Sequence, residues 1–334
     1  MVVVGAGILA TFTYVVGTYD ALQRSLELRR PGATVVPVMI SSNKTQLTQF
    51  RSKSAYPIYL TIGNIPKAIR SKPTQQAQML MGYIPTTRLK HMKNKSSQCR
   101  ALANLFHACI HKVLEPIESY GETGIAMVTG DGTWYRCHPI LATFIGDYPE
   151  QSLVACTKNG RCPKCVVPRD EIANGIRFPL RNFKAAIHVF SLSDGDQKVF
   201  NAACRNASFK PTYHPFWERL PFTNIFLSIT PDILHQLHQG ILKHMVEWVA
   251  EFASEEIDKR CSYLPLNHNA RHFHDGFTWF SRLTGKEHKD ISRILLGVVV
   301  DLDLPGIQSS ARLARVVRAL LDFIYLSQYP VHSQ

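Results

Sequence analysis

Two stretches in the first quarter of the chain have the residue pattern of β-strands. Residues 34–42 read TVVPVMISS, an apolar and largely β-branched run that predicts a buried strand. Residues 55–64 read AYPIYLTIGN and predict a second strand that closes at Gly63-Asn64. Because the two runs are joined by a short polar loop, we expect them to pair antiparallel.

Helical periodicity and one further strand follow along the chain. Apolar residues recur at three- and four-residue spacing over 97–120, which predicts a helix that ends at Gly121. The run HPILATFIG then predicts a strand that ends just before Asp147. Residues 156–225 show little periodicity and are interpreted as an inserted module. Beyond Pro231 the pattern is mostly helical, over 232–253, 277–300 and 308–327.

The bulk composition predicts a folded protein without a membrane segment. With 334 residues and 45% hydrophobic content the chain can bury a sizeable core in about two domains, or in one with a large insertion. The apolar run 1–17 lacks the basic start of a signal peptide and is at the short end for a membrane span. Within it, Gly5, Gly7 and Ala10 outline a dinucleotide-binding turn, but the following TFTYVV resists opening a helix. A NAD- or FAD-dependent enzyme is therefore the weaker hypothesis.

The positive charge is concentrated in one part of the chain. The formal net charge is +13, and the segment from Leu28 to Leu114 contains fourteen Lys or Arg and no Asp or Glu. A segment of one sign, interleaved with aromatic residues, is what a surface needs to neutralise phosphates and release their counterions. We expect DNA contacts from Lys44, Lys67, Arg70, Arg88, Lys90, Lys93 and Lys95. The alternative is a solvated basic face without a partner.

Asn43 and Asp147 each follow a predicted strand, which suggests a site built from strand ends. Enzymes that cut and join phosphodiesters with two metal ions need carboxylates that converge from different elements, because Mg²⁺ takes oxygen ligands. Asp147 suits such a site, although an Asp before Tyr148-Pro149 also forms turns. Asn43 offers a neutral oxygen and no charge.

The eight cysteines are too scattered for a disulfide scaffold, which indicates a reducing compartment. Cys162 and Cys165 have the CxxC spacing of half a zinc site. The missing ligands could be Cys156 and a distant His, or the pair His235 and His238, which would share one face of a helix. The alternative is a pair of free thiols.

The chain contains six characteristic strings in this order: VVPVMISSNKTQLT, YPIYLTIGNIPKAIR, PILATFIGDYPEQ, KNGRCPKC, DILHQLHQGILKHMVEWV and RALLDFIYLSQY. Together they resemble the Plavaka transposases, which are fungal cut-and-paste enzymes of the CACTA (En/Spm-like) group. The resemblance runs from about Thr34 to the C-terminus. It implies an α/β fold, with a ribonuclease-H-like core interrupted by a Cys/His-containing, largely helical insertion. The expected divisions are an apolar N-terminal segment at 1–33, the core at 34–155, a zinc-knuckle-like insertion at 156–225 and a helical region at 226–334.

The resemblance also implies a site and its cofactors. Family members have Asp at the position of Asn43, and the second acid falls at Asp147; Asp232 is a candidate third acid, although family chains usually continue beyond the position of Gln334. Mg²⁺ is the implied catalytic ion. A structural Zn²⁺ would lie on Cys162 and Cys165, with His235 and His238 as the remaining pair.

We therefore expect a transposon-derived protein that acts in the nucleus on the terminal inverted repeats of DNA. Its reaction would be nicking followed by strand transfer. Asn43 in place of the first acid is expected to have weakened or abolished this activity. A homo-oligomer is left open. The alternative is a non-catalytic, zinc-containing DNA-binding module that has kept the basic surface. A nuclease assay with a DNA end separates the two hypotheses.

Overall fold

The computed structural model describes residues 22–48, 53–172, 174–230, 233–280, 283–302 and 309–329. The chain divides into two compact units. The first comprises residues 1–231 with 333–334, and the second comprises residues 232–332.

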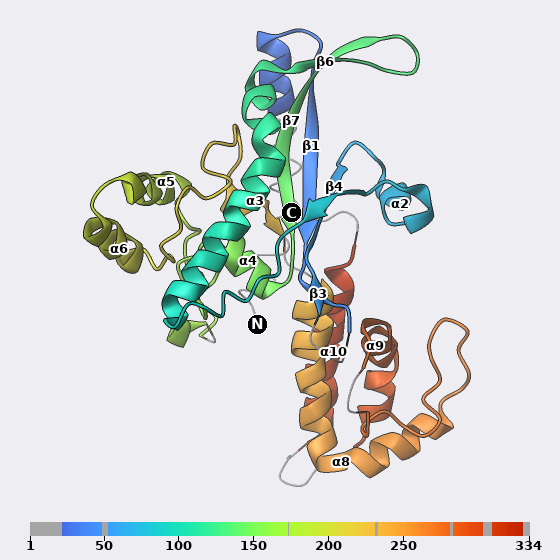
Figure 1. Cartoon of the computed structure of the whole chain (residues 1–334). Helices are drawn as coiled ribbons and strands as arrows, with labels where there is room; N and C mark the ends of the chain where they lie inside the picture. The colour runs from blue at the N-terminus through green and yellow to red at the C-terminus, as the bar shows by residue number, and fades with distance from the viewer. Residues whose placement is uncertain are drawn as a thin grey trace. The chain divides into compact units, whose positions relative to one another are not determined.

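The first unit contains a mixed sheet (Figure 1). Among the described residues it has six strands: β1 (Ala33–Ser42), β4 (Pro57–Ile62), β5 (Met79–Tyr83), β6 (Ile125–Val128), β7 (Trp134–Ile145) and β8 (Ile229–Thr230). Their order is β5-β4-β1-β7-β6, and β8 pairs with the end of β7. β1 is antiparallel to β4 but parallel to β7, and β7 is parallel to β8. The predicted strands at 34–42 and 55–64 and their antiparallel pairing are thus confirmed.

The burial of the two central strands follows from their apolar runs. Along β1 the side chains alternate between buried and half-buried, as expected of a strand with two different faces. In β7 all residues from Ile140 to Phe144 are buried, because layers of the protein cover this part of the strand on both faces. The connection between β1 and β4 was expected to be a simple loop, but it contains a second small sheet, β2 (Thr45–Gln46) with β3 (Ser54–Ala55).

The long helix α3 (Lys95–Thr123) begins at an Asn cap, since Asn94 Oδ1 accepts from Ser97 N–H at 3.0 Å. The predicted end at Gly121 is wrong. The helix continues to Gly124, which takes φ +70° and accommodates the chain reversal. Gly121 is instead a packing position, because a Cβ there would lie 2.4 Å from Pro221 Cγ.

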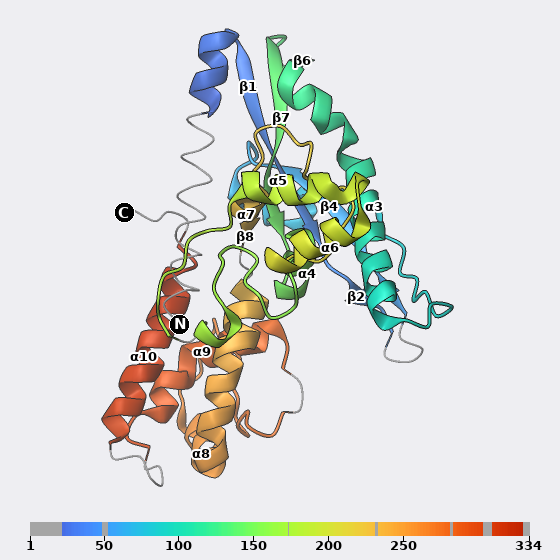
Figure 2. The same ribbon diagram turned by 90° about the vertical axis from the view of Figure 1, so that its left-hand side faces the viewer.

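Between β7 and β8 the described residues contain short helices separated by long irregular segments, in keeping with the weak periodicity of 156–225. The helices include α4 (Tyr148–Val154), η2 (Arg169–Glu171), α5 (Phe183–Ser191), η3 (Leu192–Asp194), α6 (Gln197–Asn206) and α7 (Ile225–Ser228). Figure 2 shows α5 and α6 on the same side of the sheet as α3. A single apolar core joins these elements to the sheet, and Trp217, which is fully buried, donates from Nε1 to Val154 O at 2.7 Å. Two short helices, α2 (Lys67–Arg70) and η1 (Pro73–Gln75), connect β4 to β5.

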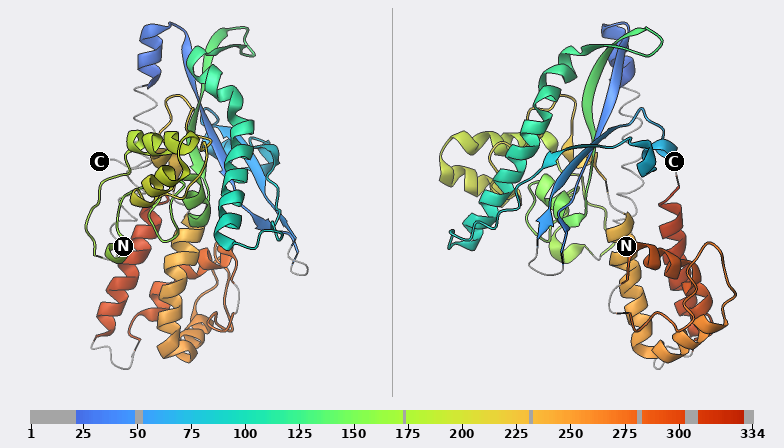
Figure 3. Two further views of the ribbon diagram at one scale, coloured as in Figure 1. Left: turned by 60° about the vertical axis from the view of Figure 1, so that its left-hand side comes forward. Right: turned by 45° about the vertical axis from the view of Figure 1, so that its right-hand side comes forward.

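The second unit is helical, as the sequence predicted, although the bounds differ (Figure 3). It contains the π-helix η4 (Ile233–Leu242), α8 (Lys243–Tyr263), α9 (Gly285–Val299) and α10 (Ser310–Leu326). The helix expected near 277 begins at 285, because Thr284 caps it in a capping box with Glu287. Across the described parts of the chain, no helix has the length and apolar content needed to cross a bilayer.

Candidate functional site

The carboxyl ends of β1 and β7 lie side by side at one edge of the sheet. The parallel register pairs Ser41 with Ile145, and the chain continues from these two residues to Asn43 and Asp147. Neighbouring strands are about 4.8 Å apart. Asn43 and Asp147, which are remote in the sequence, therefore lie just beyond the ends of two adjacent strands.

Asp147 has a structural role as well as its place at this edge. It is the N-cap of α4, and its Oδ1 accepts a hydrogen bond from Glu150 N–H at 2.9 Å. A cap of this kind contributes about 1 kcal/mol to helix stability. The side chain remains partly exposed to solvent. Asp147 thus forms a local hydrogen bond, as its turn-forming interpretation predicted, but this bond caps the first turn of a helix.

Glu150 is a buried carboxyl group beside Asp147 that the sequence reasoning missed. Its side chain is 6% exposed, and Tyr56 Oη donates to its Oε2 at 2.5 Å. Burial raises the pKa of Glu150 to about 7; the Tyr56 hydrogen bond lowers it, and the charge of Asp147 raises it further. Burial, followed by the charge of Glu150, also raises the pKa of Tyr56. Gly146 allows this close packing, because a Cβ there would lie 2.8 Å from Glu150 Cγ.

A sequence signal for Glu150 was present. Asp147 and Glu150 have the D-x-x-E spacing of a helix start, in which a capping residue is followed three positions later by an acid. The signal predicts the helix but not the burial, because burial depends on Tyr56, which lies on the segment leading into β4.

The Gln151 side chain forms hydrogen bonds to the backbone at the ends of both β7 and β8. Its Nε2 donates to Gly146 O at 2.8 Å and to Thr230 O at 3.0 Å. The third predicted acid, Asp232, comes two residues after Thr230 in the sequence and lies outside the described residues. Its role stays a prediction.

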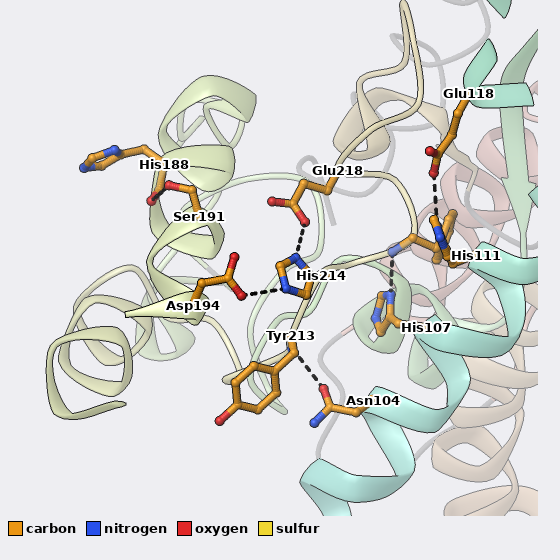
Figure 4. A network of polar contacts seen from close by, with 11 residues as sticks. Asn104, His107, His111, Glu118, His188, Ser191, Asp194, Tyr213, His214 and Glu218 are labelled. Atoms are coloured by element: carbon orange, nitrogen blue, oxygen red, sulfur yellow. Dashed lines mark hydrogen bonds and ion pairs between the residues drawn. The ribbon is translucent and has the colours of Figure 1, made fainter. Parts of the chain in front are cut away.

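A buried histidine of α3 helps to hold α4 in place. His107 Nε2 lies 3.0 Å from Leu153 O. His107 Nδ1 accepts from Phe216 N–H at 3.3 Å, the contact that Figure 4 marks at this ring, which assigns the Nε2–H tautomer. Burial lowers the pKa of His107 to about 4, so the ring is neutral at physiological pH. Tyr213 N–H donates to Asn104 Oδ1 at 3.0 Å and adds a second link between α3 and the 213–216 segment. These contacts fix the position of α4 and hence of Asp147.

The predicted DNA-contacting residues fall into two groups. Lys44 and the 88–95 segment lie at the same end of the sheet as Asn43, because β5 ends beside the start of β4 and α3 begins there. Gln98 Nε2 donates to Arg88 O at 2.5 Å and to Leu89 O at 3.2 Å, which holds this segment on α3.

The second group lies on α2, which follows the opposite end of β4. Lys67 is exposed, but Arg70 donates from Nε to Ile65 O at 2.7 Å and from Nη1 to Met39 Sδ at 2.9 Å. Arg70 therefore has a structural role in the connection after β4.

The CxxC pair has the local geometry of a thiolate turn. Cys162 Sγ accepts hydrogen bonds from the N–H groups of Lys164 and Cys165, both at 3.4 Å. The hydrogen bond from the Cys165 side chain lowers the pKa of Cys162 to about 6, while the same interaction raises the pKa of Cys165. Arg181 donates from Nε to Cys162 O at 2.9 Å. Cys156 does not face this pair; its Sγ lies 3.3 Å from His107 Nε2.

The two predicted histidine ligands lie on η4 in the second unit. His238 is buried and His235 is exposed, so the expectation that both share one face of an α-helix does not hold for this π-helix. Among the residues that the structure describes, no three His, Cys, Asp or Glu side chains are arranged to hold a metal ion. The magnesium and zinc sites stay predictions.

The first unit is thus a mixed α/β unit in which Asn43 and Asp147 follow adjacent strand ends, beside an exposed basic segment at 88–95. Residues 17–249 match the family model of the Plavaka transposase, so the chain belongs to the Plavaka transposase family. The match begins before Thr34, where the resemblance was expected to start, and it ends at 249 rather than near the C-terminus. None of the curated proteins matches the chain significantly.

Proposed function

We propose that this protein binds the ends of a transposable element through its first unit, at a Mg²⁺-dependent nicking and strand-transfer site that Asn43 has weakened. The observation that carries the proposal is the parallel register of β1 and β7, which brings Asn43 and Asp147 to neighbouring strand ends. The family match supports the transposon origin and the DNA partner. Action on chromosomal DNA would place the protein in the nucleus.

The order of elements supports a ribonuclease-H-like core. Two antiparallel strands, β1 and β4, are followed by β5, a long helix, and β7, which returns parallel to β1. The polar positions of the proposed site stand directly after β1 and β7. The short helices α4, α5, α6 and α7, which lie between β7 and β8 in the sequence, would belong to the proposed helical insertion.

The residues at this edge fit a divalent ion only in part. Mg²⁺ prefers oxygen ligands and gains most from ionised carboxylates, and when bound it would stabilise the charge that develops on a phosphodiester. Asp147 supplies one carboxylate, while Asn43 supplies a neutral amide oxygen. Glu150 holds its proton up to about pH 7 and is bonded to Tyr56. The edge therefore carries less negative charge than a pair of aspartates would.

The weak metal site also favours the second candidate function, a non-catalytic DNA-binding module. The two functions are separated with a DNA duplex that ends in the inverted repeat flanking the gene. Mg²⁺-dependent joining that is lost in Asp147→Asn supports the enzyme. Salt-sensitive binding by both proteins without joining supports the module, and absence of DNA binding contradicts both.

We further propose that Cys162 and Cys165 bind a structural zinc ion. Zinc binds thiolate, and the lowered pKa of Cys162 makes one thiolate available near neutral pH. Purified protein should contain about one zinc ion per chain. The variant Cys162→Ser should lose it, and Cys99→Ser, which changes an exposed cysteine elsewhere, should retain it. Zinc-free wild-type protein with an unchanged melting temperature would contradict this assignment.

A further inference from the structure

A basic hollow lies between α3, α6 and the segments that flank them, outside the residues predicted to touch DNA. Its volume is about 380 Å³. Its lining includes three cations: Arg100 on α3, Lys158 in the segment after α4, and Arg205 on α6. Phe209 and Pro211 also line it. Three cations thus come together from three separate parts of the sequence.

The charges of this hollow are of one sign. No Asp or Glu is among its lining residues within the described chain. Lys158 Nζ donates to Arg205 O at 3.1 Å, which holds its ammonium group at the rim, and Arg100 lies in the first turns of α3. The N-terminus of a helix adds partial positive charge. Cations gathered in this way repel one another unless an anion lies between them.

The rest of the lining is apolar. Phe209 is 4% exposed, and the guanidinium of Arg181 lies over its ring, with Cζ 5.2 Å from the centroid. Pro211 continues the apolar wall. A fully hydrated inorganic anion gains little from such a wall, whereas a deoxyribose can pack against it while its phosphate meets the cations.

The position of the hollow relates it to the proposed site. α3 starts at the end of the sheet where β1 and β7 end, and His107, about two turns beyond Arg100 on α3, contacts Leu153 of α4. The basic segment 88–95 leads directly into Lys95, the first residue of α3. The hollow and the basic 88–95 segment are therefore both next to the start of α3.

We propose that this hollow binds a sugar–phosphate unit of DNA, on the same strand that the basic 88–95 segment contacts. The inference rests on the proposed function and deepens it, since it assigns Arg100, Lys158 and Arg205 as phosphate ligands. All three lie in the unit that carries the sheet.

The test compares two double variants of the full chain on a 30-base-pair DNA duplex at several salt concentrations. Arg100→Gln with Arg205→Gln should weaken binding about tenfold and reduce the slope of log K against log salt by about two, because each phosphate contact contributes about one to that slope. The control is Arg177→Gln with Lys184→Gln, which removes the same charge from exposed positions of the same unit. It should bind like the wild type.

The outcomes are distinguishable from failure of the proposed function. If the wild type binds the duplex and the Arg100/Arg205 double variant retains its affinity and salt slope, the hollow is not a DNA site. If inorganic phosphate raises the melting temperature of the wild type alone while the DNA slopes are equal, the hollow takes free phosphate and the inference is overturned. A wild type that binds no DNA overturns the proposed function and this inference with it.

Discussion

Asn43→Asp is expected to increase Mg²⁺-dependent nicking of an inverted-repeat duplex by at least about 100-fold, which corresponds to about 3 kcal/mol of transition-state stabilisation. The new carboxylate would stand at the strand end next to Asp147, since Ser41 and Ile145 are paired in register. Two carboxylates at adjacent strand ends hold a divalent ion more tightly than one carboxylate and an amide. The initial nicking rates of the two proteins give the ratio.

A matched control places the same charge elsewhere. Asn64 is exposed and follows β4, which runs antiparallel to β1 and therefore ends away from Asn43. Asn64→Asp should not change the nicking rate. Binding of Mn²⁺, followed by its paramagnetic signal, gives a second measure that does not require turnover. If Asn43→Asp binds Mn²⁺ no more tightly than Asn64→Asp does, Asn43 and Asp147 do not share an ion.

Glu150→Gln is expected to stabilise the protein by about 3 kcal/mol at pH 8 and by less than about 1 kcal/mol at pH 5. Burial raises the pKa of Glu150 from its usual 4.5 to about 7 in the folded state. The folded protein therefore retains a proton that the unfolded chain releases, so stability falls as the pH rises from about 4.5 to 7. An uncharged Gln avoids this loss, and its amide oxygen can still accept from Tyr56.

Urea unfolding of both proteins at pH 5 and pH 8 measures the difference. Glu122→Gln is the control, because Glu122 is exposed at the end of α3. It should follow the wild type at both pH values. Equal stability of Glu150→Gln and the wild type at pH 8 would show that Glu150 is ionised without cost in the folded protein.

Much of the sheet could be predicted from the sequence. The runs at 34–42 and 138–145 are dense in apolar residues, because one face of β1 is buried and the other half-buried, while β7 is buried on both faces from Ile140 to Phe144. Long helices with regular apolar spacing were recognisable for a similar reason, as at 97–120 and 308–327.

The missed elements have weak or mixed patterns. β5 and β6 lie at the two ends of the strand order and expose most of their apolar side chains, so neither has the alternation of a half-buried strand. The helices α5 and α6 are short, and their boundaries depend on the caps Asn182 and Asp196 rather than on periodicity. At Gly121 the sequence suggested a helix end, but the close approach of Pro221 explains the glycine.

The sequence by itself determined the family, the concentration of positive charge in the 28–114 segment, and the presence of a polar or acidic residue after each central strand. These properties follow from local composition and short motifs. Only the tertiary structure decided that β7 returns parallel to β1 in the register that aligns Asn43 with Asp147, and that Glu150 is buried against Tyr56. Strand pairing and burial join residues that are far apart in the chain, and no local pattern encodes which distant segment will be the neighbour.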